Sequence, residues 1–311
     1  MGAVPDLLAV VNAAAGSADR PRVDAATTAL RTAAGRVGAD LEVVATTDLG
    51  HLARTLAGLA GRRLVVLGGD GSVRAAVQAL HDDDALRGVG PVGIVPLGTG
   101  NDLARSLGLS AHPVRAAGTV VAGAPREMVL LVSDDGVVAV NAVHVGVGAA
   151  AGRNAAGLKR SLGRVGLGAL AYPLGAAVAG LTERGWWVRV SVDGTAVHPA
   201  DERLLMVALG LGETVGGGAP LVPGADPHEP AADVVVARAV GPLARLGYAA
   251  QLTTGAHVLR PDVVTARGRT VQLEAAPGGS FPTDVDGEVR GPFTAQRWDV
   301  RPAAWRVVVP G

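Results

Sequence analysis

The stretch LVVLGGDGSVRAAVQAL, residues 64–80, joins an apolar run to a helix-like one through Gly68-Gly69-Asp70-Gly71-Ser72. The apolar run predicts a buried strand, and the residues after the glycines predict a helix. Glycines allow a sharp turn and let a ligand approach the backbone closely, and the N–H groups at a helix start favour phosphate. A plain strand-to-helix turn, with Asp70 capping the helix, is the structural alternative.

Asp70 needs an explanation of its own, because an acid in a phosphate loop repels the phosphates. A divalent cation between the carboxylate and the phosphates removes that repulsion. The sequence therefore predicts that Asp70 holds a metal ion, directly or through water, or that it accepts a proton.

Outward from this turn, apolar runs alternate with helical patterns through the first third of the chain. Strands are predicted at LLAVVN, LEVVAT, RLVVLG and VGIVPLG, and helices at 22–35, 51–59 and 72–80. Fully apolar strands interleaved with helices predict a parallel sheet covered on both faces. Ligands of such sheets bind at the carboxyl ends of the strands, which here are the loops 12–16, 46–50, 68–72 and 98–102.

A second glycine loop follows at the next strand end, in PLGTGNDLARSLG, residues 96–108. It combines glycines with a hydroxyl, an amide and an acid, from Thr99, Asn101 and Asp102. Two such loops at adjacent strand ends predict a shared site for phosphate and metal.

From about residue 128 the pattern changes to β-rich runs with Gly and Asp turns. Asp134-Asp135-Gly136 predicts a hairpin, and further strands are predicted at WWVRVSVDGTAVH, RLLMVALGLG, ADVVVARAV, TVQLEA and WRVVVP. A helical region is expected over 159–181. The predicted fold class is an α/β nucleotide-binding domain with a parallel sheet plus a second, β-rich sandwich-like domain, with the active site in the cleft between them.

Composition narrows the class of protein. The 311 residues, 49% of them hydrophobic, predict two domains. Equal numbers of basic and acidic residues, 28 of each, give no support for a nucleic-acid partner. The chain has no cysteine, and its N-terminus lacks the basic region of a signal peptide. The uncharged residues 165–182 are rich in Gly and Ala, which favours a buried or interfacial helix over a membrane span, so a cytoplasmic protein is expected.

The stretch DVDGEV, residues 284–289, places Asp286 and Glu288 beside a tight glycine turn. Beside a phosphate and metal site, one carboxylate can take the proton of an attacking hydroxyl, and carboxylates can hold Mg²⁺. An ordinary hairpin turn is the alternative, since Asp-Gly is common in turns.

The order and spacing of GGDGS, PLGTGND and DVDGE resemble the diacylglycerol kinase catalytic domain family. That family includes bacterial soluble lipid kinases and the sphingosine and ceramide kinases, and its superfamily contains NAD kinases and 6-phosphofructokinases. The resemblance extends over nearly the whole chain. NAAAG keeps Asn12 and Gly16 of the family's phosphate loop, ATTDLGHLA places its nucleotide-contacting threonine at Thr46, and LKRSLGRVGLGALAYPL and VGGGAPLVPGADPHEPAADVVV match later segments.

The resemblance implies an ATP- and Mg²⁺-dependent kinase of lipid metabolism that phosphorylates the hydroxyl of a diacylglycerol-like lipid. It implies Glu288 as proton acceptor with Asp286 as its close partner, and Asp70 as a catalytic group. It implies a nucleotide-binding domain at 1–126, rejoined by 293–311, and a lipid-substrate domain at 127–292. The implied nucleotide contacts are Asn12, Gly16, Thr46, Gly68, Gly69, Asp70, Gly71, Ser72, Thr99, Asn101 and Asp102.

Three segments depart from the family pattern. Glu229-Pro230 replaces the metal-binding Asp-Gly, so Glu229 is a metal-ligand candidate whose longer side chain weakens the match. Gly146-Val147-Gly148-Ala149 lacks an expected acid, and ALGLGETVGGG lacks an expected Asn. These departures lie in the implied lipid-substrate domain and leave the nucleotide motifs unchanged.

A kinase that acts on lipid must dock transiently on a membrane surface. The segment 153–164, with four basic residues and no acid, fits anionic headgroups, ATP phosphates or a solvated helix face. A homodimer is left open. Two other functions are kept as alternatives: a kinase of NAD or a sugar phosphate, and a degenerate family member that binds nucleotide or lipid as a regulator.

Overall fold

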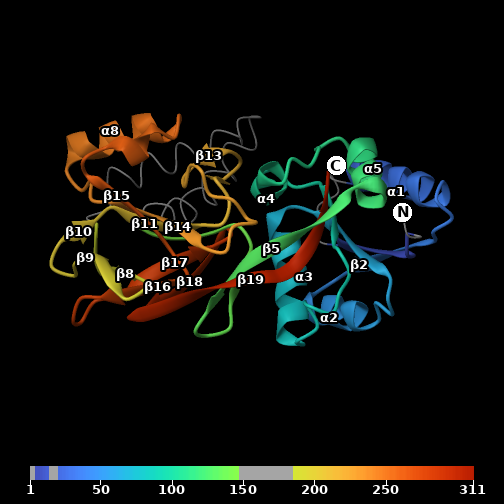
Figure 1. Cartoon of the computed structure of the whole chain (residues 1–311), viewed down its shortest axis with the longest axis horizontal. Coiled ribbons are helices and arrows are strands. Elements are labelled where there is room, and N and C mark those ends of the chain that lie inside the picture. The colour runs from blue at the N-terminus through green and yellow to red at the C-terminus, as the bar shows by residue number, and fades with distance from the viewer. Residues whose placement is uncertain (1–3, 14–19, 147–184) are drawn as a thin grey trace. The chain divides into compact units, whose positions relative to one another are not determined.

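The computed structural model describes residues 4–13, 20–146 and 185–311, and the chain divides into two units (Figure 1). The first unit comprises Met1–Leu130, Pro227–Glu229 and Pro302–Gly311, and the second comprises Leu131–Asp226 and Pro230–Arg301. The predictions for Gly16, residues 147–149, the basic segment 153–164, the helical region 159–181 and the uncharged run 165–182 lie outside the described residues.

The first unit is built on four parallel strands in the order β2-β1-β3-β4. The strands are β1 (Leu7–Asn12), β2 (Leu41–Thr46), β3 (Arg63–Gly68) and β4 (Gly93–Pro96). The helices are α1 (Arg20–Gly35), α2 (Leu49–Ala57), α3 (Asp70–Asp82), α4 (Asp102–Ser106) and α5 (Pro113–Ala122). The parallel sheet with its interleaved helices confirms the predicted α/β fold, whereas α4 and α5 are elements that the sequence pattern did not indicate.

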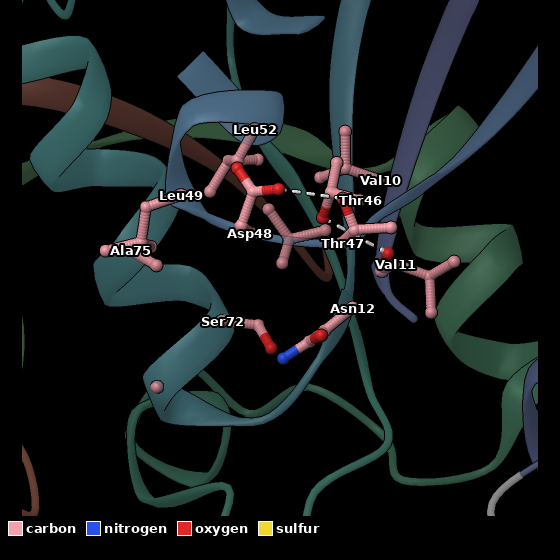
Figure 2. Close-up of a pocket in the computed structure, with 12 residues that line it drawn as sticks. Val10, Val11, Asn12, Thr46, Thr47, Asp48, Leu49, Leu52, Ser72 and Ala75 are labelled. Carbon is pink, nitrogen blue, oxygen red and sulfur yellow. Dashed lines mark hydrogen bonds between the residues drawn. The ribbon is translucent and has the colours of Figure 1, made fainter. Parts of the chain in front are cut away.

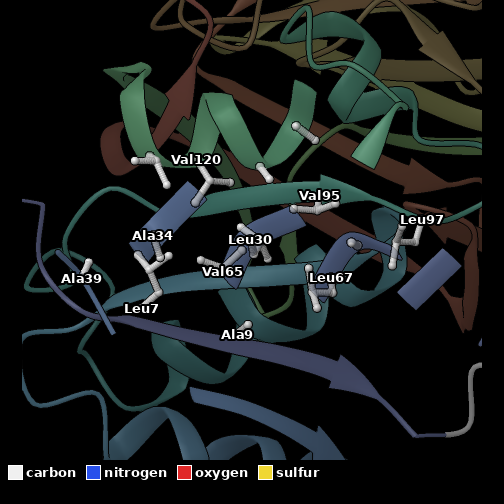
Figure 3. Packing of buried hydrophobic residues seen from close by; sticks show 14 residues of the cluster. Leu7, Ala9, Leu30, Ala34, Ala39, Val65, Leu67, Val95, Leu97 and Val120 are labelled. Carbon is white, nitrogen blue, oxygen red and sulfur yellow. The ribbon is translucent and has the colours of Figure 1, made fainter. Parts of the chain in front are cut away.

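Both faces of this sheet are covered. On one face, side chains of β1, β3 and β4 form a cluster with α1 and α5 (Figure 3), which includes Leu7, Ala9, Leu30, Val65, Leu67, Val95 and Val120. Helix α5 lies so close that a Cβ atom on Gly93 would stand 2.9 Å from the methyl groups of Val120. The intervening residues Leu8, Val10, Leu64 and Val66 are also buried, and α2 and α3 contact β2 and β3. Burial on both faces explains why β1, β3 and β4 are mostly apolar, whereas the edge strand β2 is only partly buried.

The second unit confirms the predicted β-rich, sandwich-like domain. One sheet has the order β15-β14-β11-β7-β17-β18, and the other runs β10-β8-β16-β19-β5-β6 with β9 paired to β8. The first sheet comprises β7 (Ala142–Gly146), β11 (Met206–Gly210), β14 (Ala232–Ala237), β15 (Val263–Gly268), β17 (Phe281–Val285) and β18 (Glu288–Phe293). The other comprises β5 (Ala124–Ser133), β6 (Val138–Ala139), β8 (Trp186–Val192), β9 (Thr195–His198), β10 (Arg203–Leu204), β16 (Thr270–Ala275) and β19 (Ala295–Val309).

Smaller elements complete this unit. The strands β12 (Thr214–Val215) and β13 (Ala219–Pro220) pair with each other. Helix α8 (Pro242–Leu252) and the 3₁₀-helix η4 (Ala256–Leu259) were not indicated by the sequence pattern. Among the described residues, no helix has the length and apolar character needed to cross a membrane.

Two strands, β5 and β19, contribute residues to both units. Strands β5 and β6 pair as the predicted hairpin, with Leu131 opposite Ala139. At the other end of β19, Val307 forms a parallel bridge with Val92, and the Trp305 indole N–H donates to the Val129 carbonyl at 3.3 Å. These contacts fix the last residues of the chain to the first unit.

Candidate active site

A pocket of about 250 Å³ opens in the first unit at the carboxyl end of β1 and β2, beside α2 and α3. Its polar lining includes Asn12, Thr46 and Ser72, and Figure 2 shows Asn12 and Ser72 pointing toward one another. The full lining is Val10, Val11, Asn12, Thr46, Thr47, Asp48, Leu49, Leu52, Val66, Gly71, Ser72 and Ala75. An apolar wall with a few converging polar groups is typical of a small-molecule site. Four predicted nucleotide contacts, Asn12, Thr46, Gly71 and Ser72, therefore line the same pocket.

The polar side chains of this pocket are held by neighbouring backbone groups. The Thr46 hydroxyl is buried and donates to the Val11 carbonyl at 3.3 Å. Asp48, which the sequence analysis did not select, caps α2 by accepting the His51 backbone N–H at 2.8 Å. Its place directly before a helical pattern was the signal that could have identified it.

Asp70 joins the two glycine loops. Its Oδ2 accepts the Asp102 backbone N–H at 2.9 Å, and its Oδ1 accepts that of Leu103 at 3.1 Å. The carboxylate thus caps the start of α4, while its own helix α3 is preceded by Gly69 and has no side-chain cap. The sequence alone left open that Asp70 caps the helix that follows it. In the structure Asp70 caps a helix, but that helix is the neighbouring α4.

The loops also touch through their backbones. A Cβ atom on Gly98 would stand 2.6 Å from the Gly69 Cα, and one on Gly69 would stand 2.9 Å from the Gly98 Cα. A Cβ on Gly68 would lie 2.4 Å from the Ser72 hydroxyl oxygen. Only glycine fits at these positions, so packing alone accounts for part of both motifs.

The second loop is ordered by its own side chains. Asn101 has a left-handed backbone, with φ of 51°, and its Nδ2 donates to the Gly98 carbonyl at 2.7 Å. Asp102 is buried and accepts from Arg105 at 2.7 Å. Thr99 is exposed at the tip of the loop. Asn101 and Asp102 thus shape the loop, and Thr99 remains accessible.

Burial raises the pKa of the Asp70 carboxyl, although the two N–H donors oppose this change. A carboxylate in such a setting gains from a nearby cation. Each Asp70 oxygen accepts one backbone N–H and keeps a further lone pair, so the group fits a cation that approaches directly or through water.

The described residues fit a Mg²⁺ ion that is held mainly by phosphates and water. They contain no group of three or more His, Asp or Glu side chains that could enclose a metal ion. Mg²⁺ commonly binds one or two carboxylates together with waters and substrate phosphates. The other metal-ligand candidate, Glu229, is exposed and lies in the short segment Pro227–Glu229, which belongs to the first unit.

In the second unit, Asp286 and Gly287 form the two-residue turn between β17 and β18. Both have positive φ, 50° and 92°, which is typical of a tight hairpin. Figure 1 shows β17 and β18 in this unit. The turn leaves Glu288 exposed at the start of β18.

The Asp286 carboxylate fastens this turn to the segment before β7. It accepts the backbone N–H groups of Val140, Asn141 and Ala142 at 2.8, 3.0 and 2.8 Å. The Asp286 N–H in turn donates to the Ala142 carbonyl at 3.0 Å. Asp286 therefore orients the backbone that carries Glu288.

A buried pair that the sequence analysis missed lies beneath the same turn. Asp284 accepts the Gly287 N–H at 2.7 Å, and its Oδ1 stands 3.7 Å from the His144 Nε2. Burial lowers the pKa of His144, against the opposing charge of Asp284. The two residues face each other on adjacent strands, which no local sequence pattern reveals.

Comparisons with known proteins agree with these features. The diacylglycerol kinase catalytic domain model matches residues 6–132, and the YegS C-terminal NAD kinase beta sandwich-like domain model matches residues 141–309. A Mycobacterium tuberculosis protein named "Diacylglycerol kinase" is 31% identical over 269 residues, covering 85% of this chain and 82% of the relative. A Pseudomonas fluorescens protein named "Probable lipid kinase YegS-like" is 32% identical over 284 residues, covering 88% and 87%.

A solved structure shows the same fold. A Bacillus anthracis chain, provisionally described as a diacylglycerol kinase, aligns with a TM-score of 0.77 at 20% identity and covers 99% of each chain. The α/β unit with its glycine loops and the β-sandwich unit, taken with these matches, define the class of two-domain lipid kinases. The chain belongs to the diacylglycerol kinase family.

Proposed function

We propose that the protein is an ATP- and Mg²⁺-dependent kinase that transfers the γ-phosphoryl group to the hydroxyl of a diacylglycerol-like lipid. The observation that carries the proposal is the pocket at the carboxyl end of β1 and β2, where Asn12, Thr46 and Ser72 meet. Family membership supports ATP as the phosphate donor, and the relatives' names support a lipid acceptor.

The nucleotide is assigned to the first unit. Part of the nucleoside would occupy the pocket, against its apolar wall, with hydrogen bonds to Asn12 and Thr46. The phosphates would lie over Gly68–Ser72 and Thr99, at the N-terminus of α3, where the helix dipole favours negative charge. Asp70 keeps the two loops together through its bonds to Asp102 and Leu103.

Mg²⁺ would bind at Asp70, through water or directly, with Glu229 as a second candidate ligand. When bound, the ion neutralises phosphate charge as the phosphoryl group is transferred. Asp70 holds both loops in place. Its carboxyl, whose pKa is raised by burial, would also serve as a ligand of the ion or of a water bound to it.

Glu288 is assigned the role of general base. It takes the proton of the lipid hydroxyl while the hydroxyl oxygen forms a bond to the γ-phosphorus. The bond between that phosphorus and the β–γ bridging oxygen breaks, and ADP leaves with the electron pair. Asp286 acts as a positioning residue, because its carboxylate is occupied by the backbone of residues 140–142.

The test is phosphoryl transfer from labelled ATP, with Mg²⁺, to a panel of acceptors. Diacylglycerol, a sphingoid base and ceramide are offered in mixed micelles, and NAD and a sugar phosphate in solution. Label on diacylglycerol is the expected result. Label on NAD or the sugar phosphate alone would overturn the lipid assignment, and ATP binding without transfer to any acceptor would favour a nucleotide-binding regulator.

A further inference from the structure

Helix α8 of the second unit buries its one charged residue and exposes two large apolar side chains. Its one charged residue, Arg245, is 8% exposed and Tyr248 is 4% exposed, whereas Leu243 is 84% and Leu246 is 54% exposed. A surface helix normally buries its apolar stripe and turns charge outward. The three-residue spacing places both leucines on the same outer face.

The adjacent η4 extends this apolar character. It contacts α8, and its Leu259 is 84% exposed. We call Leu243, Leu246 and Leu259 the leucine face. The inner side is firmly packed, because the Tyr248 and His257 rings meet at 5.1 Å and the His257 Nε2 lies 3.0 Å from the Leu221 carbonyl. The leucines are therefore presented by an anchored element.

The sequence around the leucine face carries little negative charge. Residues 234–261 contain three arginines and no acid. Arg260 lies against α8, where a Cβ on Gly247 would stand 2.5 Å from its guanidinium, and it is bonded to Asp262 at 2.6 and 2.7 Å. Arg245 is buried and Arg260 is paired with Asp262, so the span adds little positive charge, and it presents no unpaired acid that would repel lipid phosphates.

The size of the face argues against a second copy of the chain. An 11-residue helix is about 16 Å long and about 10 Å across. Such a surface falls well short of the roughly 800 Å² per partner that a stable protein interface buries. Shallow insertion into a bilayer has no such area requirement, because apolar side chains need only reach the boundary between headgroups and acyl chains.

We propose that the leucine face docks on a lipid bilayer that contains anionic lipids, with Leu243, Leu246 and Leu259 inserted at the headgroup–acyl boundary. The inference rests on the proposed function, since a kinase with a lipid acceptor must reach that acceptor in a membrane. It assigns a role to the outer side of α8 and η4, whose inner side packs against the core through Tyr248.

The experiment is co-sedimentation of the full chain with vesicles of phosphatidylcholine and phosphatidylglycerol. The double variant Leu243→Asp with Leu246→Asp is expected to bind roughly tenfold more weakly or worse, since two apolar side chains are lost from the bilayer. Val114→Asp is the matched control, because Val114 is 64% exposed on α5 of the first unit and its variant should bind like the wild type. The variant Leu243→Trp should bind the vesicles more tightly than the wild type. If the double variant does not fold, this variant tests the docking proposal by itself.

Unchanged vesicle binding of both leucine variants would overturn the docking proposal. Light scattering gives a second test. If the wild type is a dimer and the double variant is a monomer, the leucine face joins two copies of the chain, and the docking proposal is overturned. Activity on a water-soluble, short-chain diacylglycerol separates this proposal from the proposed function. The double variant should keep that activity and lose activity on vesicle-embedded diacylglycerol, whereas a wild type that is inactive on both contradicts the kinase assignment and leaves the binding result standing.

Discussion

Asp70 and Asp286 act in similar ways in different units. Each carboxylate accepts backbone N–H groups from a separate segment: Asp70 from the start of α4, and Asp286 from residues 140–142. Each carboxylate thereby connects two segments of chain that are far apart in sequence. Asp70 lies in the proposed phosphate loop, and Asp286 lies two residues before Glu288, the proposed general base. A chemically suggestive acid in a motif can thus owe much of its importance to backbone contacts.

The contribution of Asp286 can be measured against a matched turn. Asp286→Ala should lower the unfolding free energy by about 1–3 kcal/mol, because three N–H groups lose their acceptor. It should also lower kcat, since Glu288 loses its support, with the affinity for ATP unchanged. Steady-state kinetics and denaturant unfolding provide the two readouts.

Asp193-Gly194 supplies the control for this variant. It is also an Asp-Gly hairpin turn with positive φ, 49° and 80°, and the Asp193 Oδ1 accepts the backbone N–H groups of Arg269 and Thr270. Asp193→Ala should cost stability and leave kcat unchanged. Equal losses of kcat in the two variants would show that the Asp286 effect is only a loss of stability.

At the scale of elements, the two glycine loops form a single backbone contact. Gly98→Ala should destabilise the first unit by ~1–3 kcal/mol, because the new Cβ would stand 2.6 Å from the Gly69 Cα and the loops must separate. Nucleotide affinity should fall with it, as measured by calorimetry. Gly118→Ala is the comparison, since Gly118 in α5 has open space around it and alanine there should add about 0.4–1 kcal/mol. If Gly98→Ala changed neither the unfolding free energy nor the nucleotide affinity, the close contact of the two loops would be contradicted.

Elements whose sequence pattern matches their burial could be predicted. Strands β1, β3 and β4 are largely buried on both faces and read as apolar runs, so the parallel sheet and its carboxyl-end loops followed from sequence. Helix α8 could not be predicted, because it buries Arg245 and exposes Leu243, and this reversal hides the usual amphipathic signal. Helix α5 is Ala- and Val-rich, and such a short apolar run does not distinguish helix from strand.

The candidate site was predictable only where its residues are local in sequence. Gly68–Ser72, Thr99 and Glu288 stand in recognisable motifs. The Asp284–His144 pair was not predictable, because its members are neighbours only through the pairing of β17 with β7. The bond from Asp70 to α4 was hidden for a similar reason, since α4 itself has only five residues.

At the scale of the molecule, the second unit holds three histidines whose pKa is lowered by burial. These are His144, His198 and His257. The unfolded chain binds protons near the ordinary pKa of about 6.5, and the folded unit does not. The stability of the second unit should therefore fall as the pH drops below that value.

Tryptophan fluorescence is the suitable readout for this pH dependence, because Trp186, Trp187 and Trp298 lie in the second unit and only Trp305 lies in the first. Unfolding midpoints should decrease from about pH 7 to about pH 5. His257→Gln should flatten that decrease, since the amide can still reach the Leu221 carbonyl and does not titrate in this range. A decrease identical in wild type and variant would exclude His257 as a contributor.

The central claim is the proposed transfer of the γ-phosphoryl group of ATP to a diacylglycerol-like lipid with Glu288 as general base. Single-turnover transfer from labelled ATP to diacylglycerol, at saturating nucleotide, tests it most directly. Glu288→Gln should transfer at least ~10²-fold more slowly than the wild type while binding ATP equally well. Glu274→Gln, at an exposed position on β16, should transfer at the wild-type rate. Wild-type transfer by Glu288→Gln would contradict the account.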